Sequence, residues 1–187
     1  GKASFFGASY KADIEAALDA QEKMFRPIKK AKKKLPRFVM LGGNHEDRIH
    51  RVLDYDNHLT GAIGYNDLEY GRRWDFYPFL EKVVIDGVTY SHYIQGGNSG
   101  RAIAGKYHAT AILMQELVST TVGHSHTLDY RQMMSGQDKR IHGLAAGCYF
   151  DHHESYAGPS QSKWWRGVTV KRSVHKGDYD AQFISLA

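Results

Sequence analysis

The chain has 187 residues, of which 42% are hydrophobic and 24% are charged, and its formal net charge is +5. Such a chain can bury one sizeable core and is globular rather than disordered, so we expect a single domain over residues 1–187. Its apolar runs are far shorter than the ~20 residues that a membrane span requires, which argues against a membrane partner.

The first predicted element is a helix from about Ser9, a suitable N-cap, to Phe25. Ile14, Leu18 and Phe25 recur at helical spacing and should form its buried side. Pro27 should kink or restart the helix rather than lie in its interior, because proline lacks the backbone N–H that a helix uses.

A basic run follows this helix and comprises Arg26, Lys29, Lys30, Lys32, Lys33, Lys34 and Arg37. These charges together exceed the net charge of +5, so the basicity of the chain is local. Cations at the carboxyl end of a helix complement its dipole, which makes a solvated helix end one interpretation. The other is contact with a nucleic-acid backbone, for which the candidates are Lys29, Lys30, Lys32, Lys33 and Lys34.

Residues 38–41 are apolar and lie between Pro36 and a glycine pair, which predicts a buried strand. The polar string Asn44-His45-Glu46 comes just after it, at the carboxyl end of the strand, where open α/β sheets place their chemistry. The glycines allow a sharp turn, and the three side chains bring an amide oxygen, an imidazole and a carboxylate to one point. Such a turn suits a metal and a phosphate, and the simpler interpretation is a strand-to-helix turn with an N-cap.

The segment after this turn predicts a short helix over residues 46–53 and then a long loop over residues 54–73 with short helical turns. A loop of this length inside a compact domain is usually functional or disordered. It is therefore a candidate substrate lid that carries Tyr65 and Tyr70, with Trp74 at its end, and surface packing is the alternative.

Strands are predicted at residues 74–76, 82–85 and 88–93, and Asp86-Gly87 is a strong hairpin signal between the last two. The third strand delivers His92 near its end. A lone histidine is more often a satisfied core or surface residue than a ligand, so His92 gains meaning only with partners.

Residues 95–100 are rich in glycine but lack the lysine of a nucleotide P-loop, so we interpret them as a rim of the site. A helix is predicted over residues 103–117, and His108 on it is left undecided. The side of this helix expected to be buried comprises Tyr107, Ala111, Met114 and Leu117.

The β-branched residues 118–122 predict a strand that ends in Gly123-His124-Ser125-His126. Two histidines at i and i+2 on an extended segment point to the same side, so His124 and His126 could serve neighbouring metals. Further strands are expected at residues 127–133, 140–146, 168–174 and 181–186, with Gly177-Asp178 as a hairpin turn. Residues 151–165 are irregular, and His152 and His153 within them are interpreted as exposed loop histidines.

Gly43-Asn44-His45-Glu46, then His92, then Gly123-His124-Ser125-His126, in that order and at strand ends, resemble the calcineurin-like metallophosphoesterase superfamily. Residues 43–48 and 156–159 are also similar to its bacteriophage-encoded members. The resemblance implies that Asn44, His92 and His124 bind one metal and that His126 binds the other. A phage protein of this type would work in the cytoplasm of the host cell, and the single Cys148 is consistent with a reducing compartment.

The resemblance also implies that His45 is not a ligand but the acid near the leaving group, oriented by a nearby carboxylate, for which Glu46 is the candidate. Arg48 is a phosphate clamp by its own chemistry. These three residues are the predicted catalytic set.

The family's Asp-x-His and Gly-Asp-x-x-Asp blocks, which supply two ligands of the first metal and the bridging aspartate, do not occur before Asn44. We therefore expect an N-terminally incomplete domain, a fragment rather than a natural one-metal variant. Residues 56–58 and 151–153 fit Asp-x-His but follow no suitable strand, which disfavours a circular permutation.

The sequence is thus interpreted as an α/β protein, a two-sheet sandwich flanked by helices with its metal site at strand ends. The predicted function is hydrolysis of phosphomonoesters or phosphodiesters at two divalent metal ions, of which this chain is expected to bind one firmly and the second weakly or not at all. The mixed ligands suit Mn, Fe or Zn. A nuclease acting on DNA or RNA and a non-catalytic binding module that lost the first metal are the alternatives.

Overall fold

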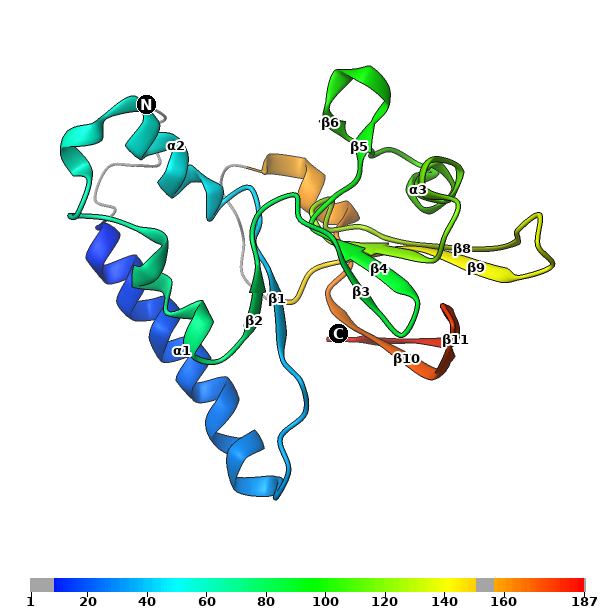
Figure 1. The fold of residues 1–187 in the computed structure, drawn as a ribbon, viewed down its shortest axis with the longest axis horizontal. Coiled ribbons are helices and arrows are strands. Elements are labelled where there is room, and N and C mark those ends of the chain that lie inside the picture. The colour runs from blue at the N-terminus through cyan, green and yellow to red at the C-terminus, as the bar shows by residue number, and fades with distance from the viewer. Residues whose placement is uncertain (1–8, 151–156, 187) are drawn as a thin grey trace. The chain divides into compact units, whose positions relative to one another are not determined.

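The computed structural model describes residues 9–150 and 157–186. The chain divides into two compact units, Gly1–Phe79 and Leu80–Ala187, and both combine helices with strands (Figure 1). The α/β class is therefore confirmed, whereas the single domain over residues 1–187 stays a prediction. Within the described ranges, no helix has the length and apolar character needed to cross a membrane.

The first unit begins with helix α1 (Tyr10–Ala31). Ser9 is its N-cap, as predicted, and the Ser9 hydroxyl accepts a hydrogen bond from the Ala12 N–H at 3.4 Å. The helix runs through Pro27, so the predicted kink or restart is wrong. Pro27 lies on the exposed side of the last turns, where water can satisfy the Lys23 carbonyl that loses its N–H partner.

Strand β1 (Val39–Leu41) pairs in parallel with β2 (Asp75–Tyr77), so the carboxyl ends of both strands lie at one edge. The helix α2 (Asp47–Tyr55) and three short 3-10 turns connect them: η2 (Asn57–Leu59), η3 (Tyr65–Leu68) and η4 (Tyr70–Arg72). The connection confirms the predicted short helix and the loop with helical turns. It also fixes the place of the polar turn, which leaves β1 at the carboxyl edge and enters α2.

An aromatic cluster holds α1 on this crossover. The Phe25 ring lies 4.6 Å from Phe38 and 5.0 Å from Trp74, both edge-on. Trp74 also donates its indole N–H to Gln21 at 2.9 Å, and the Gln21 amide in turn donates to the Leu68 carbonyl. Trp74 therefore belongs to the core of the first unit rather than to a mobile lid.

The second unit is built on a mixed sheet of five strands. In spatial order these are β3 (Val83–Ile85), β4 (Val88–Ser91), β7 (Thr120–Val122), β9 (Arg140–Ala146) and β8 (Leu128–Met134). The central three strands are parallel, and each edge strand is antiparallel to its neighbour. The carboxyl ends of β4, β7 and β9 consequently meet at one edge, which is the edge expected to carry the site.

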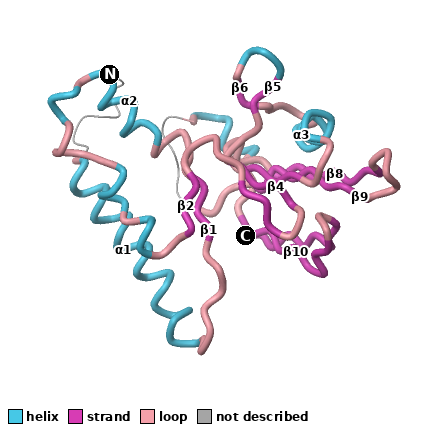
Figure 2. Tube along the Cα trace, viewed as in Figure 1, coloured by secondary structure: helices cyan, strands magenta, loops and turns pink. Residues whose placement is uncertain are grey.

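The remaining elements of this unit are β5 (Gln95–Gly96), η5 (Gly97–Ser99), β6 (Arg101–Ala102), α3 (His108–Glu116), η6 (Gly158–Lys163), β10 (Gly167–His175) and β11 (Asp178–Ser185). Figure 2 shows β4, β8, β9 and β10 close together, with the small strands β5 and β6 apart from them. The glycine-rich rim forms the small β5–β6 hairpin, and the turn of the β10–β11 hairpin is Lys176-Gly177, one residue before the predicted position.

Alternate residues of β9 show what covers each face of the sheet. A Cβ atom at Gly143 would overlap the Ala109 carbonyl oxygen, so α3 rests directly on the backbone of β9. His142 points to the opposite face, where its ring stacks on Tyr179 of β11 at 4.2 Å. The sheet thus lies between α3 and the β10–β11 hairpin, and Ile94, Ile112, Val122 and Ala145 form a buried cluster on it.

The buried side of α3 differs from the prediction. Ile112 and Leu113 are fully buried, whereas Tyr107, Met114 and Leu117 are 69%, 63% and 64% exposed. Residue 103 is not helical, because its N–H pairs with the Ile94 carbonyl at 2.8 Å. The helix therefore starts five residues later than predicted, and Gly143 selects which of its sides faces the sheet.

His142 is fully buried and hydrogen-bonded through both ring nitrogens, to the Tyr130 hydroxyl and to the Asp178 carboxylate, each at 2.7 Å. Arg140 also binds Asp178 through two hydrogen bonds. The Arg140 guanidinium, and less strongly His142, lower the pKa of Asp178 from 3.8 to about 2.

We expect Asp178→Ala to destabilise the second unit by about 1–3 kcal/mol at neutral pH, because it leaves the buried His142 nitrogen without its partner. The folded pKa of Asp178 lies below its ordinary value, so its carboxylate contributes stability above about pH 4 and loses that contribution as the pH falls toward 2. Urea unfolding of both proteins between pH 7 and 2 measures this. A difference that grew on acidification would contradict the assignment.

Candidate functional site

Two of the four predicted metal ligands meet at the carboxyl edge of the five-stranded sheet. His92 follows β4 and His124 follows β7, and these strands are adjacent and parallel. Their ring nitrogens, Nε2 of His92 and Nδ1 of His124, lie 3.1 Å apart, and both side chains are half-buried. The Gly123 N–H also binds the His92 carbonyl at 3.1 Å, which couples the two strand ends.

The backbone after β7 is not the extended segment that the i, i+2 argument assumed. His124 and His126 both have positive φ angles, 51° and 60°, and the Ser125 N–H contacts the Gly123 carbonyl at 2.6 Å. The left-handed conformation costs a residue that bears a side chain roughly 1–2 kcal/mol, and Asp86 and Lys176 adopt it as well, in hairpin turns. The predicted extended geometry of His124 and His126 is therefore wrong.

His126 faces a different environment from His124. Its ring lies edge-on to Trp164 at 4.4 Å and to Phe150 at 5.5 Å, while the His124 ring lies beside His92 and Tyr93. The His126 carbonyl accepts a hydrogen bond from the Trp165 N–H at 2.9 Å. The tight turn therefore gives the two histidines separate neighbours.

Beneath the motif lies His108, which the sequence left undecided. Its side chain is 1% exposed, and its Nδ1 is 3.2 Å from the Ser125 hydroxyl, which in turn lies 3.2 Å from the Thr127 hydroxyl. Burial lowers the pKa of His108, so the ring is neutral at neutral pH and can bond Ser125 without a buried charge. This hydrogen bond joins α3 to the turn that carries His124 and His126.

The polar turn of the first unit is organised by its own side chains. Glu46 accepts a hydrogen bond from the Gly43 N–H at 2.8 Å, and Arg51 donates to the Asn44 carbonyl at 3.1 Å. Asn44 is half-buried and His45 is exposed. The Glu46 carboxylate thus caps the turn, and its predicted role of orienting His45 stays a prediction.

Arg48 lies next to His45, with its Nη2 atom 3.4 Å from the His45 Nε2 atom. Because arginine can only donate, the His45 Nε2 atom is the acceptor in this contact. The predicted catalytic set therefore shares one exposed surface of the first unit.

Gly42 of this turn is closely packed, and neither Gly42 nor Gly43 has a positive φ. A Cβ atom at Gly42 would lie 3.1 Å from both the Phe76 ring and the Phe79 nitrogen, so a larger residue would have to displace these neighbours by a few tenths of an ångström.

The basic run lies at the opposite end of β1 from this turn. Residues 29–37 end α1 and enter β1, whereas the turn leaves β1 at its carboxyl end (Figure 1). The five lysines are exposed, and no ion pair among the described residues involves them. Strand β1 therefore lies between the basic run and the predicted catalytic residues.

The donor set fits a metal in part. Nitrogens bound at 2.0–2.1 Å to one tetrahedral ion lie ~3.3 Å apart, close to the separation of the His92 and His124 nitrogens, and an N–H···N hydrogen bond gives a similar distance. Residues 9–150 and 157–186 contain no group of three His, Cys, Asp or Glu side chains that could hold an ion. Asn44 belongs to the first unit, and His152 and His153 lie outside the described residues.

Comparisons of the chain with protein-family models, curated proteins and solved structures gave no match. The resemblance to metallophosphoesterases therefore depends on the motifs alone.

Proposed function

We propose that this protein is a metal-dependent phosphoesterase with a metallophosphoesterase-like sandwich fold. The observation that carries the proposal is the meeting of His92 and His124 at the ends of adjacent parallel strands. The two residues are 32 positions apart in the chain, so their meeting depends on the parallel pairing of β4 with β7.

His92 and His124 would hold one ion and His126 would contribute to another, while Asn44 stays a predicted ligand on the first unit. A bound divalent metal would supply Lewis-acid stabilisation of phosphate charge and lower the pKa of water. The chain's own residues supply the rest: His45 protonates the departing alkoxide, and Arg48 offers a bidentate guanidinium to the phosphate oxygens. Both side chains are exposed, so a substrate can reach them.

The chain should bind one divalent ion firmly and a second weakly, because His126 is a single ligand and a catalytic site usually has about three. Elemental analysis after dialysis against Mn²⁺ or Zn²⁺, together with hydrolysis of 4-nitrophenyl phosphate and its bis ester, tests this. EDTA should abolish the hydrolysis. Two tightly held ions per chain would contradict the stoichiometry, and no hydrolysis with Mn²⁺, Fe²⁺ or Zn²⁺ would favour the non-catalytic binding module.

A nuclease is the second candidate, and the exposed, unneutralised lysines of residues 29–34 favour it. Their charge would contact a nucleic-acid backbone, and that affinity would fall steeply with salt. The position of the run at the far end of β1 favours a small ester over a long polymer. A comparison of turnover for single-stranded DNA and a mononucleotide ester at several salt concentrations separates the two functions.

A further inference from the structure

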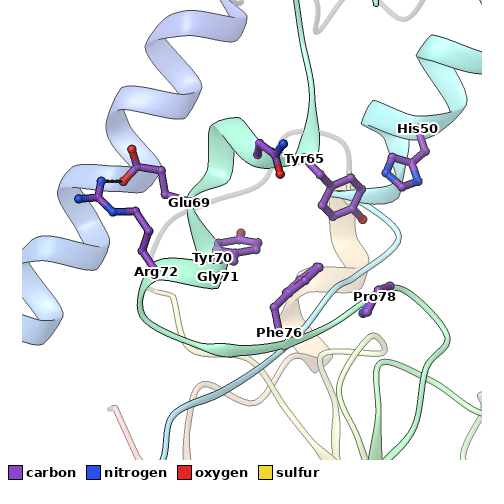
Figure 3. Close-up of a pocket in the computed structure, with 9 residues that line it drawn as sticks. His50, Tyr65, Glu69, Tyr70, Gly71, Arg72, Phe76 and Pro78 are labelled. Carbon is purple, nitrogen blue, oxygen red and sulfur yellow. Dashed lines mark hydrogen bonds and ion pairs between the residues drawn. The ribbon is translucent and has the colours of Figure 1, made fainter. Parts of the chain in front are cut away.

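A cavity of about 560 Å³ in the first unit is not used by the proposed reaction. Figure 3 shows the rings of Tyr65, Tyr70 and Phe76 gathered around it. The remaining lining residues are His50, Asn66, Glu69, Gly71, Arg72 and Pro78. A volume in the range of roughly 300–1,000 Å³ suits a small-molecule ligand, so the cavity is large enough for a nucleotide.

The cavity wall is aromatic. The Phe76 ring lies 5.3 Å from Tyr70 and 5.7 Å from Tyr65, both tilted, and the His50 ring lies edge-on to Tyr65 at 4.2 Å. These rings line the space between η3, η4 and β2. A planar ring would bind such a wall more favourably than an aliphatic chain, because stacking between flat π systems contributes additional binding free energy.

The lining carries no net charge. Glu69 and Arg72 form an ion pair with each other to one side of the rings (Figure 3). Burial, together with the Asp47 and Glu46 carboxylates, raises the pKa of Tyr65 to about 12, and burial and Glu46 do the same for Tyr70. Both phenols therefore stay neutral well beyond physiological pH, and the wall suits an uncharged ring.

The cavity adjoins the turn that bears His45. His50 is on α2, whose first residue Asp47 continues the string Asn44-His45-Glu46. Glu46, the N-cap of α2, precedes this first residue, so the helix that carries His50 begins at the predicted catalytic turn. A ligand with its ring in the cavity would thus direct the rest of the molecule toward the predicted catalytic residues.

We propose that this cavity binds the nucleobase of the substrate, so that the phosphoester hydrolysed is a nucleotide. The three rings stack on the base, and the Asn66 amide and the His50 imidazole offer donors and acceptors to its polar edge. The cavity would be the reason that residues 54–73 form a long, ordered, aromatic crossover. This proposal rests on the proposed phosphoesterase function for the reaction, but the binding step can be tested without it.

The test is titration of adenosine into the full chain in EDTA, followed by calorimetry. Adenosine has no phosphate to hydrolyse and needs no metal. We expect saturable binding of one equivalent, and Tyr65→Leu should weaken it by about 5- to 150-fold, the range for loss of one stacking ring. Tyr65→Phe keeps the ring and should retain binding, and Tyr55→Leu is the matched control because Tyr55 is 95% exposed on α2 and lies outside the lining.

If Tyr65→Leu fails to fold, Asn66→Ala changes only an exposed side chain and should still weaken adenosine by several fold. Absence of adenosine binding by the unaltered chain, or equal binding by the Tyr65→Leu and Tyr55→Leu proteins, would overturn the inference. Hydrolysis of nitrophenyl esters without adenosine binding would remove the base site alone. Adenosine binding without any hydrolysis would keep the base site and remove the proposed reaction.

Discussion

Replacing His92 by alanine is expected to remove the firmly bound metal and reduce phosphoester hydrolysis to background for every substrate. His92 is one of the two described side chains whose nitrogens meet at the sheet edge, 3.1 Å from atom to atom. The loss in metal affinity should exceed the ~10- to 100-fold that follows removal of a residue that merely orients a ligand. Calorimetric titration with Mn²⁺ and nitrophenyl ester assays measure the two effects.

His175→Ala is the matched control for this variant. His175 is an exposed histidine at the end of β10 in the same unit, so its loss changes charge and size equally without touching the strand ends of β4 and β7. Circular dichroism should show both variants folded. A His92→Ala protein that kept wild-type Mn²⁺ affinity would show that the His92–His124 contact is an ordinary hydrogen bond, and the metal assignment would fall.

The strands of the second unit were largely predictable from local pattern. Strand β9 has the predicted bounds, Arg140–Ala146, and Asp86-Gly87 forms the predicted hairpin turn with both φ angles positive, 51° and 82°. Both depend on short-range signals, the hydrophobic run and the turn residues that tolerate a left-handed backbone. The sequence therefore placed His92 and His124 at strand ends correctly.

The order of strands in the sheet could not be predicted from local sequence patterns. His92 and His124 meet because β4 and β7 are neighbours, a property of the whole sheet. The buried side of α3 was likewise set from a distance, because Gly143 exposes bare backbone to Ala109. The left-handed angles at His124 and His126 were also invisible, since histidine gives no signal comparable to glycine.

The aromatic cavity was only partly foreseeable. Tyr65 and Tyr70 were noted as residues of a long functional loop, but their convergence on Phe76 requires the parallel pairing of β1 with β2. A cavity-lining role for His50 was not predicted, because it lies on a helix whose amphipathic pattern does not indicate a ligand site. A lid and a cavity wall differ in the residues that each ring contacts. The sequence pattern does not predict these contacts.

Replacing His45 by alanine should leave metal binding intact and lower turnover by ~10²- to 10⁴-fold, the usual contribution of a general acid. The loss should be smaller for nitrophenyl esters than for alkyl esters, because a nitrophenolate departs with little need of a proton. His58→Ala, an exposed histidine on η2 of the same unit, should change neither quantity. Turnover of a nitrophenyl and an alkyl ester at saturating Mn²⁺ gives the comparison. Loss of the metal itself would show that His45 is a ligand. Equal losses of turnover for the two esters would show that His45 binds the substrate rather than acting as the acid. Only proton donation makes the loss depend on the basicity of the departing oxygen.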